Sequence, residues 1–232
     1  MNKIMMILII GVVACATASA RDNDNDPYIH VDWSPLFTDN VGWNIYSGGF
    51  VVGWNNASGI NSAMGRSIDI GWLSIIGAKY NTGHGQRITM GAGIDWRNYR
   101  LDTSARFVDD GDHISIDGYP EGATSCLSRV KVFSITMPVI FSQRLVHKLD
   151  IFAGPVVNFN VRSSVLTQFR LGDEKVKLSR TGIHQVPVTV DIMGGIKWRG
   201  IGCYVRYSPC HVLKGDFAPA FTPLTVGVGL AL

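Results

Sequence analysis

Long stretches of the chain alternate between apolar and polar residues, and this two-residue period is the feature that most constrains the fold. Successive side chains of a β-strand point to opposite faces, so such a period places the apolar residues on one face. The stretches 67–80 and 87–97 show it most clearly. Further strands are expected at 43–54, 133–142, 151–162, 185–198, 201–208 and 225–232. The sequence therefore predicts eight strands.

The lengths of the connections between these strands predict how they are arranged. Short connections alternate with long ones along the chain, which in an antiparallel ring puts all the long loops at one end. Several strands also exceed the roughly 5 to 6 residues usual in globular sheets and match the roughly 9 to 11 that cross a bilayer. We therefore predict an all-β fold, a closed antiparallel eight-stranded transmembrane β-barrel over residues 41–232, with short periplasmic turns and long extracellular loops. The short connections lie near 81–85, 145–148 and 199–200, and the long ones near 55–65, 102–125, 170–182 and 209–221.

The composition agrees with a chain whose outer face meets lipid. Hydrophobic residues make up 46% of the chain and charged residues 17%, against roughly 25% charged in soluble domains. A sheet that crosses a membrane must close on itself, since lipid offers its edges no hydrogen-bond partner. A soluble secreted β-sandwich remains an alternative, because its strands also alternate between an apolar and a polar face.

The beginning of the chain has the pattern of a secretory signal. Lys3 is followed by an apolar run and then by Ala18-Ser19-Ala20, a site of the kind that signal peptidase cleaves. We assign residues 1–20 to a signal peptide and residues 21–40 to a periplasmic N-terminal segment. A second possibility is lipidation of Cys15 in place of cleavage after Ala20.

The polar face of the predicted strands carries charges of both signs. Inside a narrow barrel such charges are stable only when they pair, so a network of ion pairs and hydrogen bonds is expected in the lumen. Its predicted members are Asp69, Arg87, Asp95, Arg97, Arg162, Asp191, Lys197 and Arg206.

Three residues near the outer rim are weak candidates for catalysis. Ser208, His211 and His184 lie where a serine, a histidine and an acid would suit acyl chemistry. No spacing motif joins them, so we expect no enzymatic activity. The alternative is an outer-membrane lipid A-modifying hydrolase or acyltransferase with an active site at the rim.

The cysteines and the net charge say little about ligands. Cys126 and Cys210 fall at the long-loop end and are a possible disulfide, whereas Cys203 is expected to face lipid. No residue grouping indicates a metal site or a cofactor. A formal net charge of +3 does not favour a nucleic-acid partner.

Three segments carry a resemblance to a known family. The strings Gly154-Pro-Val-Val-Asn-Phe-Asn160, Val205-Arg-Tyr-Ser-Pro209 and Pro223-Leu-Thr-Val-Gly-Val-Gly-Leu-Ala-Leu232 resemble those of small outer-membrane β-barrel proteins of the Bacteroidetes, including the PorT-like group. The resemblance implies a place in the bacterial outer membrane, contact with its lipid, and insertion by the outer-membrane assembly machinery. It brings no catalytic residues, so the expected role is structural or surface-interacting, with an unknown ligand and oligomeric state.

Overall fold

A computed structural model describes residues 41–58, 65–111, 113–146, 148–215 and 221–232. The signal peptide, the segment 21–40 and Cys15 lie outside the described residues. Among the described residues, no helix has the length and apolar character needed to cross a membrane.

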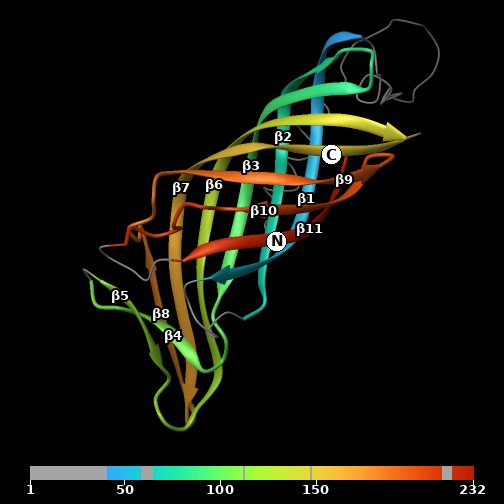
Figure 1. The fold of residues 1–232 in the computed structure, drawn as a ribbon. Coiled ribbons are helices and arrows are strands. Elements are labelled where there is room, and N and C mark those ends of the chain that lie inside the picture. Colours follow the sequence, from blue (N-terminus) through green and yellow to red (C-terminus); the bar gives the residue numbers. More distant parts are fainter. Residues whose placement is uncertain (1–40, 59–64, 112, 147, 216–220) are drawn as a thin grey trace, which may run out of the picture.

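Eight antiparallel strands form a closed ring (Figure 1). Neighbours pair in the order β6, β3, β2, β1, β11, β10, β9 and β7, and β7 pairs again with β6. This closure confirms the predicted barrel and excludes the β-sandwich, whose two sheets would have unpaired edges. The eight strands are β1 (Gly42–Ser58), β2 (Ser67–Asn81), β3 (Gln86–Arg100), β6 (Ala123–Val146), β7 (Leu149–Leu171), β9 (Val188–Trp198), β10 (Ile201–Tyr207) and β11 (Thr222–Leu230).

The connections are sorted by length as predicted. The short connections between β2 and β3, β6 and β7, and β9 and β10 lie at one end of the barrel, which we name the short-turn end. At the other end, two of the long connections contain strands of their own. These are the hairpin of β4 (Ala105–Asp109) with β5 (Ile114–Gly118), and β8 (Glu174–Thr181), which pairs with β7.

Apolar side chains form a belt around the outside of the ring. On β9, β10 and β11 exposed and buried positions alternate. Every outward position within the belt is apolar or glycine, and the polar residues lie at the inward positions. We define the apolar belt by its exposed members on these and the neighbouring strands. They include Trp54, Ile70, Trp96, Ile135, Met137, Val139, Phe141, Ile151, Phe159, Val190, Ile192, Ile196, Trp198, Val205, Tyr207, Val226 and Val228.

Two strands are much longer than predicted. β6 and β7 continue past the ring and, with β8, form a sheet that projects from the long-loop end (Figure 1). The β4–β5 hairpin packs on its inner face through Phe107 and Ile114, which are buried with Val130 and Val165. We name this part the projecting sheet.

A β-bulge at Val161 separates the barrel part of β7 from its projecting part. Phe133 pairs with Arg162, whereas the next residue, Ser134, pairs with Asn160, so Val161 is an extra residue on β7. Below the bulge the even-numbered residues of β7 face inward. Above it the odd-numbered residues, beginning with Ser163, are buried.

Candidate functional site

Polar side chains from all eight strands of the ring meet inside the barrel. Their positions follow from strand parity, because the apolar residues of each strand face outward and leave the alternate positions to the lumen. We name the central charged group, Asp69, Asp95, Arg97, Asp191 and Arg206, the lumen cluster; each member is at most 5% exposed. Polar neighbours on the remaining strands are Asn55 on β1, Ser134 on β6, Asn158 on β7 and Thr225 on β11.

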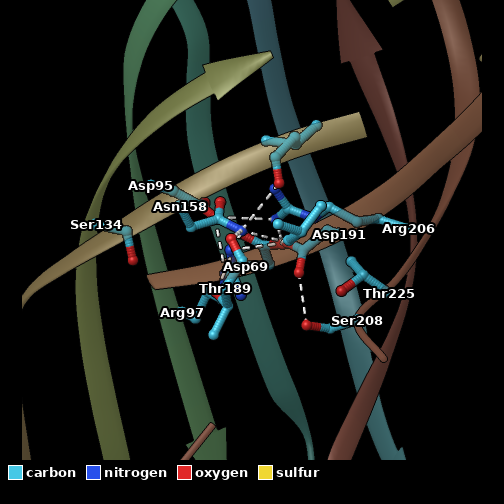
Figure 2. A network of polar contacts seen from close by, with 12 residues as sticks. Asp69, Asp95, Arg97, Ser134, Asn158, Thr189, Asp191, Arg206, Ser208 and Thr225 are labelled. Atoms are coloured by element: carbon cyan, nitrogen blue, oxygen red, sulfur yellow. Dashed lines mark hydrogen bonds and ion pairs between the residues drawn. The ribbon is translucent and has the colours of Figure 1, made fainter. Parts of the chain in front are cut away.

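Asp191 on β9 accepts the largest set of contacts in the lumen cluster (Figure 2). Its Oδ2 atom accepts hydrogen bonds from Arg97 Nη2 and from Asn158 Nδ2, both at 2.9 Å. Its Oδ1 atom accepts one from Ser208 Oγ at 2.5 Å. Arg206 Nε lies 3.8 Å from Oδ2. One carboxylate therefore links β3, β7, β9 and the end of β10.

The other two aspartates face the same two arginines. Asp95 Oδ2 lies 2.8 Å from Arg97 Nε and 3.1 Å from Arg206 Nη2. Asp69 Oδ2 pairs with Arg206 Nη2, while its Oδ1 atom has no hydrogen-bond partner among the described residues. Three carboxylates thus share two guanidinium groups, and Asp69 has the fewest contacts.

An apolar layer lies next to the lumen cluster inside the barrel. Val51, Leu73, Phe152, Met193 and Tyr204 are buried together and pack across the lumen. Charged side chains on one side and apolar side chains on the other occupy much of the interior, and a small cavity lined by Leu73, Phe152, Met193 and Lys197 lies beside the apolar layer.

Two of the predicted network residues lie elsewhere in the lumen. Arg87 Nη2 lies 3.6 Å from Asp150 Oδ2, near the short-turn end. Lys197 Nζ donates to the main-chain oxygen of Leu232 at 2.6 Å. Both face inward as predicted. The alternation of residues predicts which face of a strand a side chain lies on, but not its position along the barrel axis or its partners across the lumen.

The prediction for Arg162 is wrong. The bulge at Val161 reverses the parity of β7, so Arg162 is exposed on the outer face and its neighbour Ser163 is buried in its place. An inserted residue of this kind leaves no clear mark in a two-residue pattern.

The candidate catalytic residues do not form a catalytic pair within the described part of the chain. The Ser208 hydroxyl is buried and donates to Asp191, not to a histidine. His184 and His211 are both exposed, and the main-chain oxygen of His184 accepts from Lys214 N at 2.9 Å. The geometry gives Ser208 a structural contact to the lumen cluster.

The predicted disulfide between Cys126 and Cys210 is not formed. Cys126, Cys203 and Cys210 are all free thiols. Cys126 lies on the projecting part of β6, whereas the Cys210 thiol lies 3.9 Å from the Val190 main-chain oxygen beside the ring. The two are separated along the barrel axis, which the sequence could not show. Among the described residues, no group of three or more His, Cys, Asp or Glu side chains is arranged to hold a metal ion.

The main feature that the sequence analysis missed is the projecting sheet. Its core contains Tyr99, Phe107, Val130 and Phe221, with the rings of Tyr99 and Phe221 at 5.3 Å in an edge-to-face contact. Ser128 and Thr167 share a buried hydrogen bond of 2.8 Å between the two long strands. Residues 163–169 do not alternate cleanly between apolar and polar, so the pattern that predicted the barrel strands gives no signal for it.

Comparisons with known proteins give matches of fold only. No protein-family model matches the chain, so the PorT-like resemblance gains no support there. No curated protein matches either. Two solved structures of Ail, the attachment invasion locus protein of Yersinia pestis, one with the heparin analogue sucrose octasulfate, match 82% of this chain and 99% of theirs. Their identities are 10% and 9% and their TM-scores 0.35 and 0.34, values that do not establish a shared family.

Proposed function

We propose that this protein is a small barrel of the bacterial outer membrane that presents the projecting sheet outside the cell and has a structural or surface-interaction role. The observation that carries the proposal is a folded, loop-bearing sheet on one end of a barrel whose outer surface is an apolar belt. In water such a belt would promote aggregation, whereas in a bilayer its apolar side chains contact the lipid hydrocarbon.

The interior of the barrel supports a role that does not depend on transport. The lumen cluster and the apolar layer occupy much of the interior of a ring of eight strands, while general pores use about 16 to 18 strands. The loops and the projecting sheet are then the parts available to partners.

The proposal includes no catalytic role. Ser208 is engaged with Asp191, and the nearby His211 is exposed. If the lipid A-modifying alternative were correct, Ser208→Ala and His211→Ala would change the mass profile of lipid A in cells that express the protein. We expect both variants to leave the profile unchanged.

The membrane location is tested by fractionation and by gel mobility. We expect the protein to stay in the membrane after carbonate or urea extraction and to migrate differently on a denaturing gel before and after heating. Extraction without detergent, together with a single gel position, would refute the proposal.

The orientation is tested by labelling single cysteines in intact cells. In a background with the native cysteines replaced by serine, Gly118→Cys lies at the end of β5, where a Cβ atom meets nothing within 4 Å. Thr82→Cys lies in a turn at the short-turn end and is partly exposed. A membrane-impermeant maleimide should label position 118 and leave position 82 unlabelled; the reverse result would place the projecting sheet on the periplasmic side.

A further inference from the structure

The outer face of the projecting sheet and of the adjoining ends of β2 and β3 is strongly basic. The outward positions there are recognised by parity, since their neighbours in sequence are buried. The described outward positions of this face run along β3 from 98, β6 from 127 to 131, β7 from 162 to 170 and β8 from 175 to 179. None of these positions is Asp or Glu. We name the cations of this surface the basic face: Arg66, Arg100, Arg129, Lys131, Arg162, Arg170, Lys175 and Lys177.

Like charges lie directly opposite each other on this surface. Arg100 on β3 pairs with Arg129 on β6, and Arg170 on β7 pairs with Lys175 on β8. Opposed like charges destabilise a sheet. On this face no acidic side chain at the outward positions compensates them, so an external anion would relieve the repulsion.

Two further observations indicate that the repulsion between like charges is strongest around Arg129. Its Nε atom is shielded from solvent and has no hydrogen-bond partner among the described residues. Partial burial, and then the nearby Arg129 charge, lower the pKa of Lys131 below its ordinary value. The planar guanidinium group of an arginine is suited to bidentate contact with a phosphate.

The basic face begins where the apolar belt ends. Lys131 lies two residues beyond the outward-facing Phe133 on β6, and Arg162 directly follows Val161 and is paired with Phe133. A belt seated in the hydrocarbon core places these cations at the depth of the lipid headgroups. The rest of the basic face continues along the outer side of the same sheet.

We propose that the basic face binds the phosphorylated headgroups of the glycolipid in the membrane leaflet from which the sheet projects. The inference rests on the proposed function, because only an outer-membrane barrel in the expected orientation places this surface against that leaflet. Contact of the headgroups with Arg129, Lys131 and Arg162 would hold the projecting sheet close to the membrane surface.

The test compares binding of lipid A to the folded full chain in zwitterionic detergent micelles, measured by native mass spectrometry. The basic-face variant is Arg129→Gln/Lys131→Gln/Arg162→Gln. A control variant removes three exposed cations that lie outside the basic face: Lys148→Gln/Arg199→Gln/Lys214→Gln. All samples are first shown to be heat-modifiable on gels.

We expect the basic-face variant to bind lipid A roughly 100-fold more weakly than the wild type, at about fivefold per cation. The control should stay within about twofold, and binding should weaken with added salt and with monophosphorylated lipid A. Equal binding by the two variants, or no preference for the second phosphate, would overturn the inference and leave the barrel proposal standing.

Two other results have distinct meanings. A chain that is not heat-modifiable and does not bind micelles would overturn the proposed function and this inference together. Binding of soluble heparin by the wild type as tightly as lipid A, and lost in the same variant, would overturn the assignment to the leaflet in favour of a soluble polyanion.

Discussion

Asp191 and Asp69 are both fully buried in the lumen cluster, yet we expect their replacement by asparagine to have very different effects on the free energy of unfolding. Asp191 accepts hydrogen bonds on both oxygens, from Arg97, Asn158 and Ser208. In Asp191→Asn one oxygen becomes an NH₂ group that faces a donor. Arg97 also loses one of its two buried counter-charges and keeps Asp95, and breaking a buried ion pair costs about 3–5 kcal/mol.

Asp69→Asn should change stability by less than about 1 kcal/mol. The Asp69 carboxylate contacts Arg206 through one oxygen, and the other oxygen has no partner within the described structure. After the replacement Arg206 keeps Asp95 at 3.1 Å and Asp191 at 3.8 Å. Two carboxylates would then face two guanidinium groups, so the loss of one contact is offset by a better match of charge.

The assay is urea unfolding of the folded barrel in one fixed detergent, followed by tryptophan fluorescence. The midpoint and the slope give the free energy of unfolding of each variant. Asp109→Asn is the matched control, because its ion pair with Arg180, at 2.6 Å, lies at the exposed surface of the projecting sheet. Such surface pairs contribute about 0–1 kcal/mol.

The comparison of the two aspartates decides whether the reasoning is correct. Either replacement leaves two carboxylates facing two guanidinium groups, so the two variants differ in the contacts they lose. A cost for Asp69→Asn that equals or exceeds that of Asp191→Asn would refute the contact count. A second check is the double variant Asp191→Asn/Arg97→Met, which also removes the guanidinium group that loses its contact with Asp191. It should recover part of the lost stability, since the two sites are coupled.

Further predictions concern packing and titration. Gly93→Ala should destabilise the barrel by about 1–3 kcal/mol in the same urea assay, because its Cβ atom would collide with the main-chain oxygens of Trp72 and Leu73, whereas Gly118→Ala should have no effect. Phe107→Ala should cost the projecting sheet about 3–5 kcal/mol and make it sensitive to protease while the barrel remains heat-modifiable; unchanged protease resistance would contradict this. Burial raises the pKa of Tyr119 to about 12, so the tyrosinate absorbance of the wild type minus Tyr119→Phe should rise near pH 12 and not near pH 10. Since the unfolded phenol ionises first, the contribution of Tyr119 to stability is complete below pH 10 and is lost as the pH rises toward 12.

Strand parity predicted most of the barrel and most of the lumen correctly. Asp69, Asp95, Arg97, Asp191 and Arg206 come together because each faces away from the apolar side of its own strand. Arg87 and Lys197 also face inward, but they join other partners. Contacts across a barrel depend on the stagger between strands, which is set by pairing and does not appear in the pattern of a single strand.

The rest could not be predicted because it depends on tertiary contacts between loops. The residues that bury Phe107 come from β6 and β7 and from the connection before β11, far apart in sequence. The separation of Cys126 from Cys210 likewise follows from the extension of β6 past the ring. Both features depend on residues outside the predicted strands 133–142 and 151–162.

The bulge at Val161 separates the sequence requirements of two surfaces that share one continuous strand. Below it, β7 presents apolar residues to lipid at odd-numbered positions; above it, the odd-numbered positions, such as Val165 and Phe169, are buried on the other side of the sheet. Substitutions in the projecting half can therefore accumulate without placing a charge in the lipid-facing half. A single additional residue lets the exposed end of this molecule change independently of the part that anchors it.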